Sequence, residues 1–266
     1  MALTWLKSTA PFPFGATSLR VEHMTDYQPL MASIATKARA AARQLAAADD
    51  ATKAKALKYA AAALRDQSDD ILTANEIDVA AGTKAGLSPA MLDRLKLDEA
   101  RIAGMAAAVE QVASLADPVG QIIDSSTQPN GLQMARMRVP IGVLGIIYES
   151  RPNVTADAAA LGLRSGNAVI LRGGSEAVHS NRAIYAAMLA GITKAGLPAD
   201  AVQLVPTQDR EMVGAMLRAQ GAIDMIIPRG GKSLVARVQQ EARVPVLAHL
   251  DGINHSYVHK DADPAM

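Results

Sequence analysis

The sequence of 266 residues contains no cysteine. This absence excludes a disulfide framework, a cysteine-ligated zinc or iron–sulfur centre, and a cysteine nucleophile within the chain. It is compatible with a reducing compartment, and we expect a cytoplasmic location. No apolar run reaches the roughly 18 residues that a transmembrane helix needs, so no membrane partner is expected.

An excess of either charge is also missing. Lys and Arg total 27 and Asp and Glu total 26, which leaves a net charge of +1. Nucleic-acid-binding proteins usually carry a strongly basic face, so we expect no nucleic-acid partner. Half of the residues are hydrophobic, which excludes a disordered chain. The length predicts one large domain or two small ones.

Aromatic residues are scarce and unevenly placed. The only tryptophan, Trp5, and both phenylalanines, Phe12 and Phe14, lie near the start of the chain. This break in composition predicts that residues 1–25 lie outside the folded domain. The segment is interpreted as a flexible tail, or as a misassigned start with translation beginning at Met24. A cleaved targeting segment is a third interpretation, although no long apolar region follows a basic start.

From residue 26 to 115 the pattern is helical. Apolar residues recur at three- and four-residue spacing in three stretches. These are Ile34, Ala38, Ala41 and Leu45; Leu57, Ala60, Ala61 and Leu64; and Ile102, Met105, Val109 and Val112. Asp98 is the predicted N-cap of the last stretch. Because many of these positions are alanine, we expect the helices to approach each other closely.

The pattern then changes to strands. Two alternating segments around the loop 125–131 predict a β-hairpin over residues 120–139. After Pro140, short apolar runs alternate with helical stretches, which is typical of βαβ units. The expected strands are 143–147, 168–171, 202–205, 224–227 and 246–248, and the expected helices are about 154–165, 176–195, 210–219 and 231–241. The predicted fold is therefore α/β, with an open parallel sheet over 141–260 and helices on both faces.

Ligands of such sheets bind beyond the carboxyl ends of the strands. The dinucleotide fingerprint G-x-G-x-x-G is absent after every predicted strand. Gly231-Lys232-Ser233 resembles the end of a P-loop, but Ile226 stands where the first glycine belongs, so the match fails. Pro206, which follows the strand predicted at 202–205, belongs to the same sheet edge.

Two double-glycine turns remain as candidates, and each directly follows a strand. They are Arg172-Gly173-Gly174-Ser175 and Pro228-Arg229-Gly230-Gly231. Glycine lets the backbone approach a ligand, the following helix N-terminus favours an anion, and arginine can bind phosphate through two donors. The turns predict a dinucleotide with phosphates, while two ordinary strand-to-helix turns remain the alternative.

Asn153 stands at a predicted helix start. Its side chain can cap that helix, or its amide can donate to a developing oxyanion. The five histidines form no ligand cluster. His249 and His255 on either side of Asp251 are a weak metal signal, so no metal site is predicted.

The segments Tyr148–Thr155 and Gly166–Gly174 resemble the gamma-glutamyl phosphate reductase family, a branch of the aldehyde dehydrogenase superfamily. Further matching segments are Leu87–Leu95, Leu115–Gly120, Ile223–Gly231 and His249–Gly252. The resemblance covers roughly residues 30–260. It implies NADPH-dependent reduction of a small molecule, L-glutamyl 5-phosphate, to L-glutamate 5-semialdehyde in proline biosynthesis. In that reaction a catalytic cysteine forms a thioester that accepts the hydride.

The resemblance also assigns roles to individual residues. It implies that Asn153 stabilises the oxyanion, that Arg172 holds the adenosine ribose, and that Ser175 lies where a 2′-phosphate is accepted. Arg229 and the two glycines after it fit the pyrophosphate side. No acidic residue occurs between Arg172 and Ser175, which favours NADP over NAD. The full-length family member is expected to be a homo-oligomer.

One departure from the family is decisive. The family's cysteine lies beyond Met266, so residues 26–266 are expected to be an NADP-binding domain without the catalytic domain. We predict that the purified chain does not carry out phosphate-dependent reduction of NADP with glutamate semialdehyde, and such activity would refute this interpretation. The alternatives are a reductase cut short, a cofactor-binding module without catalysis, and a subunit that a second polypeptide completes.

Overall fold

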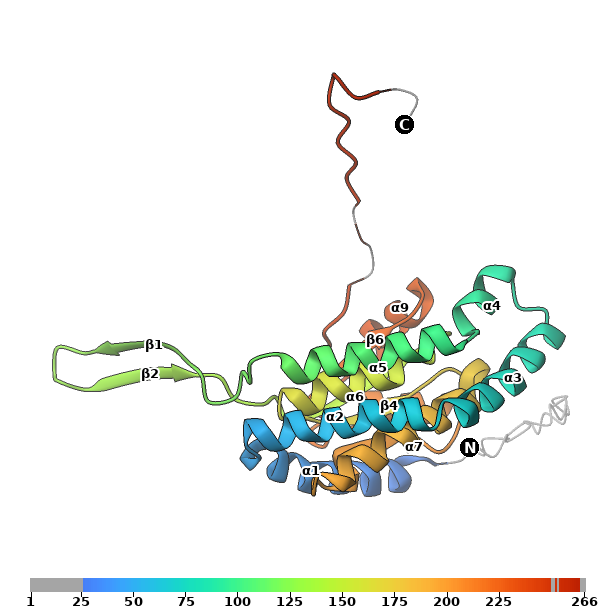
Figure 1. The fold of residues 1–266 in the computed structure, drawn as a ribbon. Helices are drawn as coiled ribbons and strands as arrows, with labels where there is room; N and C mark the ends of the chain where they lie inside the picture. Colours follow the sequence, from blue (N-terminus) through green and yellow to red (C-terminus); the bar gives the residue numbers. More distant parts are fainter. Residues whose placement is uncertain (1–25, 250–251, 253, 264–266) are drawn as a thin grey trace, which may run out of the picture.

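The computed structural model describes residues 26–249, 252 and 254–263. The extension expected over residues 1–25, with Trp5, Phe12 and Phe14, lies outside the described residues. In Figure 1 the described chain forms a layered body from which a long hairpin projects. Among the described helices, none combines the length and apolar character required to cross a membrane.

A parallel sheet lies at the centre, as predicted. Its strands are β3 (Val143–Tyr148), β4 (Ala168–Arg172), β5 (Val202–Leu204) and β6 (Met225–Arg229), in the order β5-β4-β3-β6. Every residue of β3 is buried. Helices cover both faces of the sheet, so its strands are near-continuous apolar runs. The short apolar runs of the sequence therefore predicted where these four strands lie to within about two residues.

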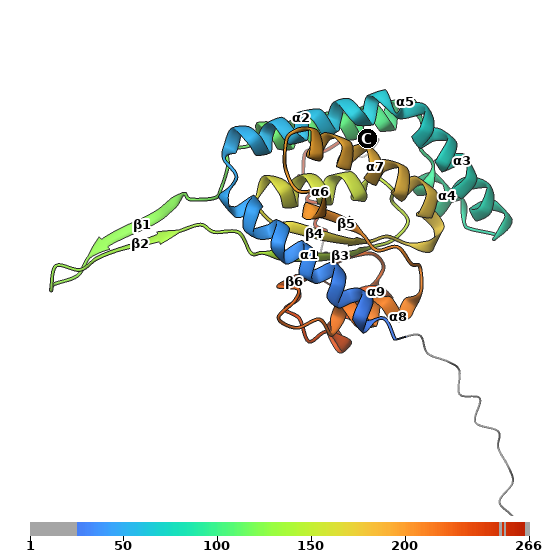
Figure 2. The ribbon, with the colours of Figure 1, turned by 90° about the horizontal axis from the view of Figure 1, so that it is seen from below.

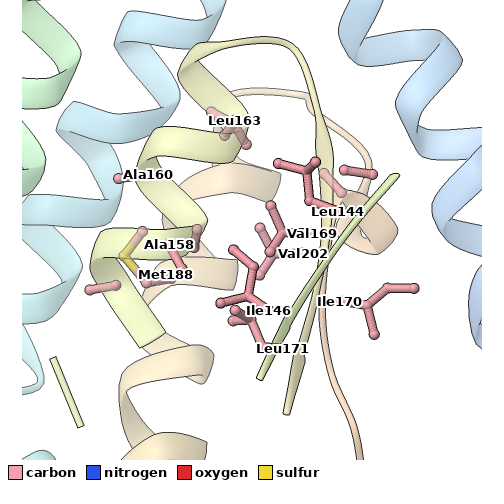
Figure 3. Close-up of a cluster of buried hydrophobic side chains, with 14 of the residues drawn as sticks. Leu144, Ile146, Ala158, Ala160, Leu163, Val169, Ile170, Leu171, Met188 and Val202 are labelled. Atoms are coloured by element: carbon pink, nitrogen blue, oxygen red, sulfur yellow. The ribbon is translucent and has the colours of Figure 1, made fainter. Parts of the chain in front are cut away.

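The register sorts side chains onto two faces. Leu144 and Ile146 of β3 lie opposite Val169 and Leu171 of β4. In Figure 3 this set points towards α6 (Val154–Arg164), whereas Ile170 points to the other side of the sheet. The alternation follows from the two-residue period of a strand.

Two groups of helices flank the sheet (Figure 2). On one side lie α6 and α7 (Val178–Lys194), and on the other α1 (Gln28–Ala47), α8 (Arg210–Leu217) and α9 (Lys232–Glu241). An outer layer beyond α6 and α7 consists of α2 (Asp50–Asp66), α3 (Ser68–Lys84), α4 (Pro89–Leu95) and α5 (Glu99–Ser114). Two 3₁₀ turns, η1 (Ser175–Ala177) and η2 (Ala199–Ala201), complete the elements.

The predicted helical core is confirmed. In the three stretches of spaced apolar residues, all but Val112 are buried, and Val112 is half-buried. Asp98 caps α5 by accepting a hydrogen bond of 2.7 Å from the backbone nitrogen of Arg101. The alanines do allow close approach, because α2 crosses α7 with Ala60 against Gly191.

The hairpin is also confirmed, as β1 (Ile122–Thr127) antiparallel to β2 (Gln133–Met137). Every residue of both strands is exposed. Ile122 and Ile123 are 57% and 58% exposed, and Met134 and Met137 are 52% and 53% exposed. Within the described part of the chain, nothing covers these apolar side chains.

Two strand predictions need correction. Residues 246–248 form no strand, and only an isolated bridge joins Val246 to Ile226. Pro245 has no N–H to donate to a ladder, and Leu247 is 61% exposed. The strand expected at 224–227 instead runs from Met225 to Arg229. Pro228 is tolerated there because β6 is the edge strand of the four-stranded sheet.

Candidate functional site

The loops after all four parallel strands meet at one edge of the sheet, as predicted from their common direction. Because β3 lies between β4 and β6, its last loop separates the two double-glycine turns. Glu149 of that loop accepts a hydrogen bond from the turn after β6, and Ser150 donates to Glu176, which follows the turn after β4. This edge therefore holds a connected set of loops.

The first connection joins β3 to the turn after β6. The backbone nitrogen of Glu149 donates to the carbonyl of Arg229 at 3.1 Å. The Glu149 carboxylate in turn accepts from the backbone nitrogen of Gly231 at 2.9 Å. Gly231 directly precedes α9, and a helix N-terminus favours a negative group. A protein carboxylate thus occupies the anion position that the sequence predicted for a pyrophosphate.

The second connection joins β3 to the turn after β4. Ser150 has a left-handed backbone with φ of 51°, which is uncommon outside glycine. The Glu176 carboxylate accepts from the Ser150 backbone nitrogen and, at 3.0 Å, from its hydroxyl. A Cβ at Gly174 would overlap this carboxylate, so a larger residue there would displace the Glu176 side chain from Ser150.

The third connection joins β4 to the loop after β5. The Arg172 guanidinium donates to the carbonyl of Gly173 at 3.1 Å and to that of Gln208 at 2.9 Å. Its Nε is buried and has no hydrogen-bond partner among the described residues. Burial lowers the pKa of Arg172, with Arg210 and Arg237 lowering it further while Glu176 and Glu149 oppose them. This guanidinium lies in a crowded cationic setting with a donor still free.

A cavity of about 340 Å³ opens beside Arg172. We call it the arginine cavity, because Arg172, Arg210 and Arg237 all line it, together with Ser175 and Ser233. Arg210 begins α8 and Arg237 lies on α9, where it pairs with Glu241 at 3.0 Å. Arg172 and Ser175 were predicted from the sequence, whereas Arg210 and Arg237 were not. No local signal marks them, because only packing brings their helices to this edge.

Two further residues predicted for this edge, Pro206 and Gly173, do not line the arginine cavity. Pro206 is exposed in the loop after β5 but does not line the arginine cavity; its neighbour Gln208 does. Gly173 faces inward, because a Cβ there would overlap the Asn181 amide and lie 3.0 Å from the Tyr148 ring. The absence of a side chain at Gly173 therefore lets the turn pack against Asn181 and Tyr148.

The second double-glycine turn lines its own cavity of about 350 Å³. Pro228, Arg229, Gly230 and Gly231 all contribute to it, and we call it the glycine-turn cavity. Glu149 lines both this cavity and the arginine cavity, so the two adjoin. The prediction that both turns lie at one edge is confirmed, while their ligand role stays a prediction.

Asn153 lies just before α6, but its side chain does not cap that helix. Its amide nitrogen donates instead to the Asp157 carboxylate, one helical turn along, at 2.8 Å. Burial raises the pKa of Asp157, and the hydrogen bond from Asn153 lowers it, with a net rise. The amide nitrogen carries a second hydrogen, so Asn153 is held in place with one donor available.

The weak metal signal at His249 and His255 can be followed in part. In the part of the chain that the structure describes, no three His, Asp or Glu side chains come together in a way that could hold an ion. His249 lines the glycine-turn cavity, and His255 is exposed. Asp251, the third member of the weak signal, lies outside the described residues.

Comparison with known proteins gives one consistent result. The sequence matches the aldehyde dehydrogenase family over residues 11–266. It is 70% identical over 236 residues to gamma-glutamyl phosphate reductase of Sphingopyxis alaskensis, covering 89% of this chain and 55% of that protein. It is 67% identical over 237 residues to the enzyme of the same name from Novosphingobium aromaticivorans, covering 89% and 56%. The chain thus spans slightly more than half the length of the curated relatives it matches.

Solved structures agree with the sequence relatives. The gamma-glutamyl phosphate reductase of Thermotoga maritima superposes with a TM-score of 0.80 at 43% identity, over 82% of this chain and 52% of that chain. An NADP complex of glyceraldehyde-3-phosphate dehydrogenase from Methanocaldococcus jannaschii superposes with a TM-score of 0.65 at 14% identity, over 85% and 47%, and so shares the fold. A match along nearly the whole sequence and a common fold together show that the chain belongs to the aldehyde dehydrogenase family.

Proposed function

We propose that this chain is the NADPH-binding part of a cytoplasmic gamma-glutamyl phosphate reductase. The whole enzyme would reduce L-glutamyl 5-phosphate to L-glutamate 5-semialdehyde in proline biosynthesis. The proposal rests on the relatives of that name, which match about nine-tenths of the chain at up to 70% identity. The observation that carries the cofactor assignment is the arginine cavity, where three guanidinium groups surround one space at the ligand-binding edge of the sheet.

The residues of this edge fit a phosphorylated dinucleotide. Arg172 keeps a buried donor without a partner, and Arg210 adds a second positive charge that an anion would balance. Ser175 would accept a 2′-phosphate, which favours NADPH over NADH. The carboxylate of Glu176, the residue after Ser175, already accepts a hydrogen bond from the Ser150 hydroxyl. When bound, the nicotinamide supplies the hydride.

The pyrophosphate would lie towards Gly230 and Gly231. Pro228 and Arg229 shape that turn, because β6 ends there. The Glu149 carboxylate now holds the Gly231 N–H, so a bound phosphate would share or replace this contact. Glu149 therefore sets how readily the turn accepts an anion.

Asn153 would donate its free amide hydrogen to the oxyanion that forms when a nucleophile attacks the acyl group. Asp157 holds the amide in position for this role. The thiolate has to come from outside this sequence, since it contains no cysteine. The whole enzyme is proposed to be a homo-oligomer, and the projecting hairpin with its exposed apolar side chains supports this.

Titration of the purified chain with NADPH tests the cofactor assignment. We expect saturable binding, and we expect Arg210→Gln to weaken NADPH about tenfold, the effect of losing one charge-assisted hydrogen bond. The affinity for NADH, which lacks the 2′-phosphate, should fall less than about twofold in Arg210→Gln if Arg210 faces that group. Fluorescence of the reduced nicotinamide measures both affinities.

Arg218→Gln is the matched control, because Arg218 lies at the end of the same helix and does not line the arginine cavity. It should leave both affinities unchanged. If Arg210→Gln lowered the affinities for NADPH and NADH equally, Arg210 would lie away from the 2′-phosphate. An absence of NADPH binding by the unaltered chain would contradict the cofactor assignment itself.

A further inference from the structure

One side chain of the arginine cavity has no part in the contacts described above. Gln208 lies in the loop between β5 and α8, and it lines the cavity. The Oε1 atom of its amide is buried, and among the described residues it has no hydrogen-bond partner. Folded proteins leave few buried acceptors unpaired, because each one costs stability. An unpaired acceptor at the wall of a ligand cavity indicates a ligand that brings a donor.

The backbone around Gln208 is held on both sides. The backbone nitrogen of Asp209 donates to the Thr207 hydroxyl at 3.2 Å, and the Asp209 carboxylate caps α8 by accepting from Glu211 at 2.9 Å. The Gln208 carbonyl accepts from Arg172, also at 2.9 Å. No such bond holds the side-chain oxygen, so turning it into the cavity breaks no hydrogen bond. A fixed backbone with a free amide suits a residue that recognises a ligand.

The cavity also has an apolar wall. Val213 of α8, Leu234 of α9 and Ile147 at the end of β3 line it together with Gln208. Val213 and Ile147 are buried, and Leu234 is half-buried. Aliphatic side chains with a few placed polar groups are typical of small-molecule sites. This part of the cavity therefore suits a flat ring with a polar edge, next to the arginines that suit phosphate.

Adenine has an edge that matches a glutamine amide. The amide oxygen can accept from the 6-amino group while the amide nitrogen donates to N7, the same pairing by which glutamine reads adenine in nucleic acids. Hypoxanthine differs from adenine at position 6, where a carbonyl oxygen replaces the amino group. It offers two acceptors at this edge, so the amide oxygen would face another oxygen. One side chain can therefore distinguish the two bases.

We infer that Gln208 is a specificity-determining residue that selects adenine as the base of the dinucleotide. Its amide binds the 6-amino group and N7, while the aliphatic side chains of α8 and α9 cover the ring. The inference rests on the proposed function and deepens it, because it assigns recognition of the base to one named side chain. The arginines of the cavity remain for the phosphates.

The test compares NADPH with its hypoxanthine analogue, in which only the 6-amino group is changed, by fluorescence of the reduced nicotinamide. We expect the unaltered chain to bind NADPH about tenfold more tightly than the analogue. Gln208→Leu should weaken NADPH about tenfold and change the affinity for the analogue less than about twofold, so the preference disappears. Gln208→Glu keeps an acceptor and should keep the preference, although its charge weakens both dinucleotides.

Gln240→Leu is the matched control, because Gln240 is an exposed glutamine of α9 outside the arginine cavity. It should keep the tenfold preference. The preference is a ratio measured on one preparation, so partial unfolding of a variant lowers both affinities and leaves the ratio unchanged. Equal binding of the two dinucleotides by the unaltered chain, or a preference that survives in Gln208→Leu, would overturn the inference.

Calorimetric titration with AMP and IMP separates this inference from the cofactor assignment. If the chain prefers AMP through Gln208 but does not bind NADPH, the base site stands and the cofactor assignment falls. If the chain binds NADPH without distinguishing the two bases, the cofactor assignment stands and the role of Gln208 falls. Binding of neither NADPH nor AMP would overturn both.

Discussion

Replacing Gly191 by alanine should destabilise the protein by about 3 kcal/mol, at the upper end of the range for overpacked cores. Gly191 lies in the last turns of α7, where that helix crosses α2. A Cβ added there would overlap the backbone N and Cα of Ala60 and approach the carbonyl carbon of Tyr59. Backbone atoms inside a helix cannot move aside singly, so the two helices would have to separate.

The same substitution at Gly104 is the matched control. Gly104 lies inside α5, and apart from the backbone of its own helix no heavy atom lies within 4 Å of where its Cβ would be. Alanine should therefore stabilise that helix by about 0.5–1 kcal/mol through propensity alone. Urea denaturation of both variants measures the two free energies of unfolding. Equal effects of the two substitutions would show that the close crossing of α2 and α7 is not what requires glycine.

The second large effect is expected at Asp117, which precedes the hairpin. Its carboxylate pairs at 2.5 Å with Lys53, whose side chain is completely buried on α2. Asp117→Asn would leave that ammonium without its counter-charge, and breaking one partner of a buried pair costs about 3–5 kcal/mol. Lys53→Met combined with Asp117→Asn should recover most of the loss, because the buried charge is then gone.

The effect should also depend on pH. Burial raises the pKa of Asp117, but the bond from Lys53, the backbone N–H of Val119 and the charges of Lys53 and Arg164 outweigh it, so the pKa lies below the ordinary 3.8. A carboxyl whose pKa is lowered by folding stabilises the protein above its unfolded pKa and loses that contribution as the pH falls through its folded value. The difference between the unaltered chain and Asp117→Asn should therefore be full at pH 7 and shrink below about pH 4. Urea unfolding at several pH values measures it, and a difference independent of pH would contradict the ion pair's role.

The layers of this fold could be predicted from local patterns. Spaced apolar residues predicted α1, α2 and α5 but not α3 and α4, and short apolar runs predicted four of the five strands. The fifth failed because a strand needs partners as well as composition: Val246 forms only one bridge, to Ile226. The hairpin was predicted from alternation, but its position away from the body was not, because alternation says nothing of what lies against either face.

The candidate site divides in the same way. The two double-glycine turns and Asn153 could be found in the sequence, because glycine pairs after strands and an amide at a helix start are local signals. Asp157 could also have been found, since it lies one helical turn after Asn153. Arg210 and Arg237 could not, because their own neighbours in the sequence give no reason to place them beside Arg172.

The sequence by itself determined the α/β class, the edge of the sheet at which the two double-glycine turns lie, and the absence of a cysteine nucleophile from these 266 residues. Each of these depends on residue type, spacing or chain direction. Tertiary structure decided which polar groups meet: the Glu149 carboxylate with the Gly231 N–H, the Glu176 carboxylate with Ser150, and Arg210 and Arg237 with Arg172 around one cavity. The physical reason is that electrostatic contacts depend on distance in space, and residues more than eighty positions apart, such as Glu149 and Gly231, become neighbours only when the strands align.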